Sequence, residues 1–264
     1  MSFLENSLLF YLFINENIMI IDFNWEKYRD MNPYLYLNGL RTKEDYEMNY
    51  FKEGRFIGRM YKEEHKSPIS IHVLIATIGN DSIFKILSIL ADQLEKRDYI
   101  TIVFDAPSVN YYKVEKYCNN IKATCNVIME EKNLGYWGHG IRNKHNQLQG
   151  DFVFHCDDDD VILPNACNKI RKICKNKDMI YIFKIITETG EVVWKRPEIK
   201  LNEISTQSGL IPVDYNSQAK WAYQYGGDYV FYKELSEKFP MLFIPEIIYQ
   251  KKRIIKSNKF NKRI

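Results

Sequence analysis

Strands and helices alternate along the middle of the chain, and this pattern limits the possible folds more than any other feature. Apolar, β-branched-rich runs predict strands at 69–76, 99–104, 125–129 and 152–155. Segments with helical spacing, or following a glycine-rich loop, predict helices at 82–94, 110–120, 138–149 and 165–175. Two further runs predict a hairpin of 179–187 with 191–194, with its turn at 188–190. Such alternation favours a mostly parallel sheet with helices on both faces, so we expect an α/β fold.

The predicted strand at 152–155 runs into four consecutive aspartates, Asp157 to Asp160, with Pro164 shortly after them. Adjacent carboxylates repel each other, and burial makes the repulsion stronger. A divalent cation relieves it, and hard oxygen ligands suit Mg²⁺ or Mn²⁺, which usually also bind substrate phosphates. The run therefore predicts a metal–diphosphate site at the carboxyl end of a strand. The alternative is a solvated acidic turn that caps a helix beginning near Asn165.

Two other predicted strands also end in polar residues, at Thr77 and at Asp105. The carboxyl ends of parallel strands lie along one rim of a sheet, where α/β proteins bind their ligands. We therefore expect Thr77, Asp105 and the Asp157–Asp160 run to meet on that rim. An isolated acidic turn does not explain why three strand ends are polar.

The composition excludes some classes of function. The net charge of +3 does not make the chain a general polycation, so we expect no nucleic-acid partner. The five cysteines contain no CxxC pair, which fits reduced thiols in the cytoplasm, or in the host-cell cytoplasm if the protein is viral. The apolar run 7–14 is too short to cross a bilayer and has no basic flank, so we expect neither a signal peptide nor a transmembrane segment. The sequence sets no oligomeric state.

Four pieces of sequence follow one another in a recognisable order. They are Ala76-Thr77 after the first strand, Asp105 after the second, the Asn-Leu-Gly…Ile-Arg-Asn segment 133–143, and the Gly-Asp-strand-Asp-x-Asp-Asp-x-x-x-Pro segment 150–164. Together they resemble the family-2-type glycosyltransferases, which have the GT-A (nucleotide-diphospho-sugar transferase) fold with an Asp-x-Asp motif. Residues 69 to about 250 carry this resemblance. The Ala-Thr-Ile-Gly end of the first strand and the Ala-Pro-Ser after Asp105 depart from the family pattern at positions implied to contact the nucleotide base.

The same resemblance suggests three segments. Residues 1–66 form an N-terminal helical extension, and they resemble a module found beside bacterial and viral glycosyltransferases; within it, Thr42 to Asp45 have the form of a capping box. Residues 67–250 form the GT-A domain. Residues 251–264 are a basic tail, either a solvated end or a segment that contacts phosphate, lipid headgroups or a partner.

For the donor side, the resemblance implies a UDP-, GDP- or dTDP-linked sugar and a divalent cation, Mn²⁺ or Mg²⁺. The register of the Asp run makes Asp157 and Asp159 the metal ligands and turns Asp158 toward the donor ribose or sugar. Asp160 is expected to cap the next helix.

Four further residues complete the expected donor site. They are Thr77, Asp105, Arg142 and Asn143. Three of them have a structural alternative: a plain loop residue for Thr77, an Asx-turn before Pro107 for Asp105, and an ion pair at the end of the sheet for Arg142.

For the acceptor side, Asp228 follows a glycine pair at the start of an amphipathic helix and resembles the general base of the family. It would deprotonate a hydroxyl of a glycan, glycoprotein or glycolipid during a single, inverting displacement. A helix N-cap is its alternative role. Trp137, Trp221, Tyr223 and Tyr225 are candidate stacking platforms for the acceptor or the donor, although each on its own is better explained as a core aromatic. Ser208 to Ile211 weakly resemble a family loop near the acceptor.

The resulting expectation is a metal-dependent hexosyl- or related transferase that inverts the anomeric centre, with retention left open. A sugar nucleotidyltransferase is one rival, but it requires a glycine-rich loop with Lys or Arg after the first strand, which 76–81 lacks. A catalytically silent carbohydrate-binding protein of the same fold is another. It would lack the metal pair or the base, and candidates for both are present in the sequence.

Overall fold

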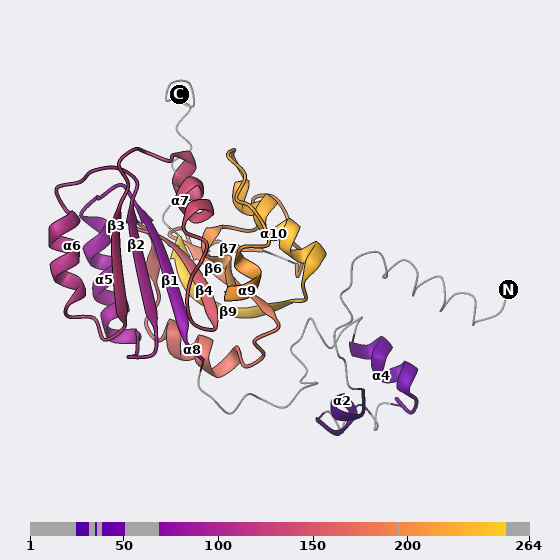
Figure 1. Ribbon diagram of the computed structural model, residues 1–264. Helices are drawn as coiled ribbons and strands as arrows, with labels where there is room; N and C mark the ends of the chain where they lie inside the picture. Colours follow the sequence, from indigo (N-terminus) through magenta and orange to yellow (C-terminus); the bar gives the residue numbers. More distant parts are fainter. Residues whose placement is uncertain (1–24, 32–34, 36–38, 51–68, 195, 252–264) are drawn as a thin grey trace.

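The computed structural model describes residues 25–31, 35, 39–50, 69–194 and 196–251 (Figure 1). Its strands are β1 (Ile71–Thr77), β2 (Tyr99–Phe104), β3 (Thr124–Met129), β4 (Phe152–Asp157), β5 (Val161–Ile162), β6 (Ile180–Thr187), β7 (Val192–Val193), β8 (Gly209–Pro212) and β9 (Met241–Lys251). Within this part of the chain, the nine strands form one sheet in the order β3-β2-β1-β4-β8-β6-β9-β5, with β7 paired to β6.

The direction of the strands agrees with the predicted, mostly parallel sheet. β1 is parallel to both β2 and β4, β2 is parallel to β3, and β6 is parallel to β9. β8 is antiparallel to β4 on one side and to β6 on the other, so β6 points the same way as β4. Six of the nine described strands therefore share one direction, and their carboxyl ends face one rim.

Helices cover both faces of the sheet (Figure 1). Those of the α/β part are α5 (Ser82–Gln93), α6 (Tyr111–Cys118), α7 (His139–Lys144), α8 (Ala166–Ile173), α9 (Val213–Asn216) and α10 (Gly227–Lys238), with 3₁₀ turns η2 (Tyr136–Gly138) and η3 (Thr206–Ser208). Side chains alternate between the two faces, as a strand requires. On β1, Val73 and Ile75 join the core that contains α5 and α8, whereas Leu74 packs with Ile141 of α7 on the opposite face.

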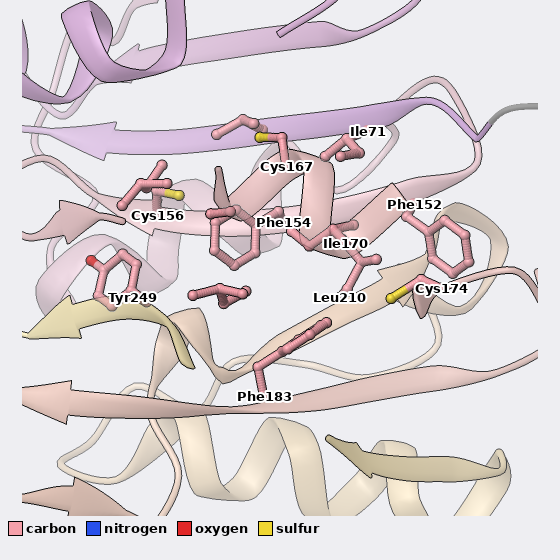
Figure 2. Packing of buried hydrophobic residues seen from close by; sticks show 14 of the residues in the cluster. Ile71, Phe152, Phe154, Cys156, Cys167, Ile170, Cys174, Phe183, Leu210 and Tyr249 are labelled. Carbon is pink, nitrogen blue, oxygen red and sulfur yellow. The ribbon is translucent and has the colours of Figure 1, made fainter. Parts of the chain in front are cut away.

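The larger core lies between the sheet and α8 (Figure 2). Phe152 and Phe154 of β4 meet Cys167 and Ile170 of α8 there, and Tyr249 brings in β9. Cys167 and Cys174, seven residues apart along α8 and its C-cap, are both buried, with 2% and 0% exposure. All five cysteines are free thiols.

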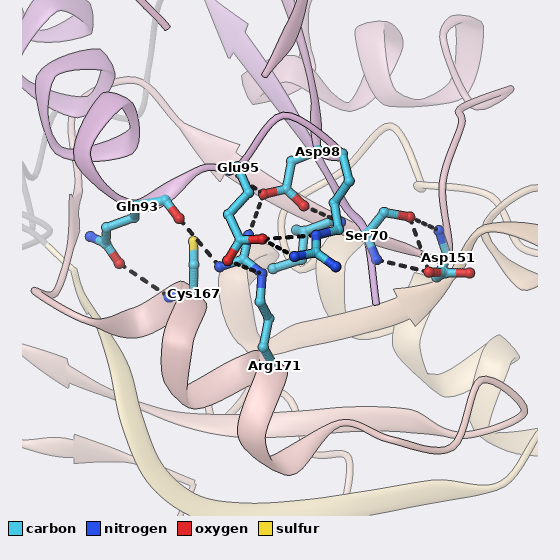
Figure 3. Close-up of polar contacts among 9 residues, drawn as sticks. Ser70, Gln93, Glu95, Asp98, Asp151, Cys167 and Arg171 are labelled. Carbon is cyan, nitrogen blue, oxygen red and sulfur yellow. Dashed lines mark hydrogen bonds and ion pairs between the residues drawn. The ribbon is translucent and has the colours of Figure 1, made fainter. Parts of the chain in front are cut away.

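A network of hydrogen bonds and ion pairs lies at the amino ends of the strands, at the edge of the sheet opposite the polar rim (Figure 3). The buried Asp98 carboxylate accepts hydrogen bonds from the amides of Ile71 (2.9 Å) and Glu95 (2.7 Å) and pairs with Arg171 of α8. Beside it, Asp151 accepts from the Ser70 amide at 2.8 Å. These charges connect α5, α8 and the starts of β1 and β2 into one unit.

Two sequence expectations need correction, and one strand was missed. The helix predicted to reach residue 149 ends at Lys144, because the backbone amide of Gln149 bonds instead to the ring of His72 at 2.9 Å. Ser208 to Ile211, which resembled an acceptor loop, contributes to β8, a buried strand in the middle of the sheet. β9 was not predicted. Its Pro245 interrupts the run, and the pairing with β6 shifts register there, as expected of a residue that lacks an amide hydrogen.

The described part of the N-terminal extension contains α2 (Trp25–Met31) and α4 (Lys43–Asn49). Thr42 and Asp45 form the predicted capping box. The rings of Tyr28 and Tyr46 pack edge-on, with their centroids 6.4 Å apart. The run 7–14, the end of the extension and the tail beyond Lys251 lie outside the described residues. Among the helices that the structure describes, none has the length and apolar character needed to cross a membrane.

Candidate active site

The three polar strand ends meet on one rim, as the sequence predicted. In the sheet, Ala76 pairs with Asp157, and Thr77 pairs with Phe104, the residue before Asp105. Thr77, Asp105 and Asp157 therefore end three neighbouring strands side by side.

Thr77 is not a plain loop residue, because its hydroxyl donates a hydrogen bond to the Asp158 carboxylate and accepts one from the Gly79 amide at 2.8 Å. Burial of Asp158 raises the pKa of its carboxyl to about 6, and the charges of Asp159 and Asp157 add to the rise. Thr77 and Asp158 thus form one buried pair at the rim. Their contact with a donor stays a prediction.

Asp157 has hydrogen-bond donors on both carboxylate oxygens. Arg142 of α7 forms an ion pair with Oδ1 at 2.5 Å, and the Gln207 side-chain amide donates to Oδ2 at 2.5 Å. The Arg142 side chain is fully buried, while that of Asp157 is 32% exposed. This ion pair is the alternative that the sequence left open for Arg142. A direct contact with the donor stays a prediction.

The loop before α7 packs closely against the buried guanidinium of Arg142 and accepts one of its hydrogen bonds. The guanidinium donates to the carbonyl oxygens of Trp137 (3.0 Å) and Cys156 (3.2 Å). Gly138 has φ of +82°, and a Cβ there would lie 2.7 Å from the Arg142 Nη1. A glycine at 138 therefore supplies both the left-handed backbone and the space for the guanidinium.

The other members of the Asp run differ in exposure. Asp159 is exposed, and its carboxylate has no hydrogen bond or ion pair with any other residue that the structure describes. Asp160 is buried and accepts from Gln207 at 3.2 Å. It does not cap the next helix: the N-cap of α8 is Asn165, which makes no side-chain capping bond.

Asp157 and Asp159 are the two carboxylates of the run that reach solvent at the rim. Over the described ranges, no group of three or more His, Cys, Asp and Glu side chains is placed to hold a metal ion. Mg²⁺-type sites commonly use only one or two carboxylates together with substrate phosphates. The hard oxygen donors of Asp157 and Asp159 fit that kind of site.

Asp105 takes a role that the sequence did not suggest. Its carboxylate accepts from the backbone amides of Leu134 (2.6 Å) and Gly135 (3.2 Å). Burial raises the pKa of the Asp105 carboxyl, and these two amide bonds partly offset the rise. Asp105 thus anchors the glycine-rich loop, and a contact with the nucleotide base stays a prediction.

Asn143 and Trp221 are bonded to each other. The Asn143 side-chain amide donates to the Trp221 carbonyl and accepts from the Trp221 amide, both at 2.9 Å. The Trp221 ring is 2% exposed and stacks on Phe231 with centroids 4.1 Å apart. Trp221 is therefore a core aromatic, the alternative that the sequence left open, and an exposed platform is not seen there. Donor binding by Asn143 stays a prediction.

Trp137 and Tyr225, in contrast, are 62% and 63% exposed. Trp137 has a left-handed backbone with φ of 53°, as does Tyr136 with φ of 55°. Tyr136 stacks on Tyr223 at 4.7 Å, which joins the loop before α7 to the loop before α10. Tyr136, Trp137, Tyr223 and Tyr225 are all exposed on these two loops, and we call these four residues the exposed aromatic patch. Of the two stacked tyrosines, Tyr223 was a predicted platform candidate and Tyr136 was not.

Asp228 lies in the first turn of α10, after an N-cap at Gly226, so the N-cap role is wrong. Its Oδ1 accepts from the Tyr229 amide at 2.8 Å, and Oδ2 has no hydrogen-bond partner among the described residues. Burial raises the pKa of the Asp228 carboxyl, and the hydrogen bond from the Tyr229 amide partly offsets the rise. The start of α10 lies against α7, because a Cβ at Gly227 would lie 2.5 Å from the His139 ring.

Gln207 is a buried residue at the Asp run that sequence reasoning missed. It is completely buried and bonds to two of the four aspartates. The only signal was its place beside Ser208, in a segment of weak resemblance. The three histidines without ligand spacing hydrogen-bond within the protein: His139 to Ala222, His145 to Glu130 and His155 to Asn216.

Comparisons with known proteins address the fold. A scan against models of protein families and a search of curated protein sequences both give no match. Among solved structures, S. aureus TarS 1–349 superposes with a TM-score of 0.59 at 16% identity, covering 70% of this chain and 60% of TarS 1–349. TarS 1–349 in complex with UDP-GlcNAc gives a TM-score of 0.58 at 17% identity, covering 74% of this chain and 62% of the other.

A third match is the mannosyltransferase PcManGT from Pyrobaculum calidifontis, solved with GDP-Man and Mn²⁺. It has a TM-score of 0.53 at 11% identity and covers 78% of this chain and 64% of PcManGT. This chain therefore spans about three fifths of the length of these proteins. At such identities the likeness establishes the fold, and the chain has the GT-A fold.

Proposed function

We propose that the protein is a glycosyltransferase that moves a sugar from a nucleoside-diphosphate donor to a hydroxyl group. The observation that carries the proposal is the position of Asp157 at the carboxyl rim of a GT-A sheet, with a second carboxylate, Asp228, in the first turn of α10, whose start lies against α7. Two proteins of this fold were solved with nucleotide sugars, one with UDP-GlcNAc and one with GDP-Man. Their ligands support a UDP- or GDP-linked donor here, and a dTDP-linked donor rests on the sequence resemblance alone.

The donor diphosphate would bind at the rim together with Mn²⁺ or Mg²⁺, held by Asp157 and Asp159. The cation would offset the negative charge that develops on the leaving diphosphate. Asp158, held by Thr77, would face the donor sugar, and Asp105 would position the loop that follows β3. Arg142 would keep the Asp157 carboxylate in one orientation.

Asp228 would act as the general base. A base works best when its pKa lies near the working pH, and burial moves the pKa of this carboxyl upward from its usual value. Its Oδ2 would take the proton from an acceptor hydroxyl as that oxygen attacks the anomeric carbon. The bond from the anomeric carbon to the diphosphate breaks as the new glycosidic bond forms, so the configuration inverts.

The acceptor would lie against the exposed aromatic patch. Aromatic rings stack on the apolar faces of sugars, and the patch offers Trp137 and Tyr225 beside the stacked pair of Tyr136 and Tyr223. Tyr225 lies in the loop that leads into α10, and Asp228 lies in the first turn of that helix, so the acceptor would bind next to the element that carries the base. A glycan, a glycoprotein or a glycolipid would fit this description.

Calorimetric binding of UDP, GDP and dTDP, with and without Mn²⁺, tests the donor site. We expect one of the three to bind, and to bind more tightly with Mn²⁺. The double variant Asp157→Ala/Asp159→Ala should lose this Mn²⁺-dependent gain. Asp92→Ala, which removes an exposed carboxylate on α5, is the matched control and should bind like the wild type. Unchanged binding by the double variant would move the metal site elsewhere.

A further inference from the structure

A buried polar turn lies directly beneath the Asp run. Ser205, Thr206, Gln207 and Ser208 are 2%, 7%, 0% and 0% exposed. Burying polar side chains costs free energy unless they are hydrogen-bonded, so a run of them inside a protein needs partners. The turn bonds within itself, where the Ser205 amide donates to the Ser208 hydroxyl at 2.9 Å, and it also bonds to the carboxylates above it.

Gln207 makes the connection to those carboxylates. Its Oε1 accepts from the Ser205 hydroxyl at 2.8 Å, which turns the amide nitrogen toward the Asp run. Nε2 then donates to Asp157 at 2.5 Å and to Asp160 at 3.2 Å. Because Arg142 holds the other oxygen of Asp157, the plane of this carboxylate is set from both sides.

The chemistry of an amide suits this position. A Lys or Arg at 207 would supply hydrogen bonds but would also neutralise the Asp run and compete with a cation. The amide of Gln207 donates two hydrogen bonds without adding charge. Each oxygen of Asp157 still has a lone pair for a further ligand after accepting one bond.

The turn is itself clamped by α10. The buried Tyr232 hydroxyl donates to the Thr206 carbonyl at 2.8 Å and accepts from the Gly209 amide at 2.9 Å, one on each side of Gln207. A Cβ at Gly209 would lie 2.4 Å from the Tyr232 ring, so the glycine lets the ring reach the turn. Since Asp228 begins the same helix, one chain of contacts runs from α10 through Gln207 to Asp157.

We propose that Gln207 is a positioning residue that holds the Asp157 carboxylate ready for the divalent cation of the donor complex, with Tyr232 holding the turn in place from α10. The inference rests on the proposed function. It assigns a role to a buried turn that would otherwise be only packing.

The test compares the Mn²⁺ affinity of variants, measured by electron paramagnetic resonance with UDP or GDP present, whichever binds the wild type. Gln207→Met keeps the length of the side chain and removes the amide. We expect it to weaken Mn²⁺ binding by about 10–100-fold, the usual cost of losing a group that orients a metal ligand. Tyr232→Phe removes only the hydroxyl and should weaken binding in the same direction by a smaller factor.

Gln93→Met is the matched control. The Gln93 amide is also bonded at both ends, to the Leu163 carbonyl (3.1 Å) and the Cys167 amide (3.1 Å), but to no carboxylate. It should leave Mn²⁺ affinity unchanged even if it lowers the melting temperature. If Gln207→Met does not fold, Tyr232→Phe and Ser205→Ala decide the question.

Wild-type affinity in a folded Gln207→Met, or an equal loss in Gln93→Met, would overturn the positioning role. Where Gln207→Met fails to fold, wild-type affinity in both Tyr232→Phe and Ser205→Ala would overturn it. A wild-type protein that binds neither nucleotide with Mn²⁺ would instead contradict the proposed function on which this role rests. The two failures are therefore distinguishable.

Discussion

Four identical residues in a row occupy different environments at the rim. Asp157 and Asp159 reach solvent, whereas Asp158 and Asp160 are buried and bonded inside the protein. The sequence already singled out Asp157 and Asp159, because the distance along the chain from the Asp run to Pro164 identifies these two as the Asp-x-Asp pair. It could not reveal Gln207, since Ser205 to Ser208 read as an ordinary polar loop, and only the placement of β8 beside β4 brings that turn under the Asp run.

At the same scale, Asp228→Asn should separate binding from chemistry. The amide keeps the size of the side chain but cannot accept a proton from the acceptor hydroxyl. Donor binding should stay near the wild-type value, while the rate of transfer falls by about 10²–10⁴-fold, the usual contribution of a general base. Binding is measured by calorimetry and transfer by release of the nucleoside diphosphate. Full transfer activity in this variant would remove Asp228 from the role of base.

At the scale of elements, long apolar strands were predictable and short or interrupted ones were not. β2 begins and ends where its apolar run does, at Tyr99 and Phe104. β8 has only four residues, too few for a pattern, and β9 contains Pro245, which usually argues against an interior strand. Both were missed for these reasons, and so was the antiparallel placement of β8 between β4 and β6.

The polar network at the amino ends of the strands should be a major source of stability. Asp98→Ala would leave Arg171, whose side chain is 11% exposed, without its closest carboxylate. Breaking a buried pair in this way costs about 3–5 kcal/mol. We therefore expect Asp98→Ala to lower the free energy of unfolding by about this amount, as measured by chemical denaturation.

Arg97→Ala is a suitable comparison, because its ion pair with Glu95 lies at the surface, with side chains 40% and 39% exposed. It should cost less than about 1 kcal/mol. If Asp98→Ala cost no more than Arg97→Ala, the network would not hold these elements together as described.

At the scale of the whole molecule, helices on both faces of the sheet remove some titratable side chains from solvent, and burial favours their neutral form. His155 of β4 is fully buried, and burial lowers the pKa of its imidazole from 6.5 to about 3, with the positive charge of Arg142 acting in the same direction. The ring bonds to Asn216 at 2.8 Å. The folded protein therefore keeps His155 neutral under conditions in which the unfolded chain binds a proton.

This depressed pKa predicts a loss of stability in acid. Above pH 6.5 the group is neutral in both states, and below it only the unfolded state gains a proton, so stability falls as the pH drops toward 3. Between pH 7 and pH 5 the contribution is about 2 kcal/mol. Urea unfolding of the wild type and of His155→Gln at both pH values checks this, because groups that titrate equally in both proteins cancel. Equal pH dependence of the two proteins would contradict it.

The central claim is a metal-dependent transfer from a nucleotide sugar, and turnover of the donor tests it most directly. Purified protein is incubated with UDP-, GDP- and dTDP-linked sugars, with and without Mn²⁺, and the released nucleoside diphosphate is measured. We predict release from at least one donor that depends on Mn²⁺ and is lost in Asp157→Ala/Asp159→Ala. No release from any donor, or release that persists in the double variant, would contradict the claim.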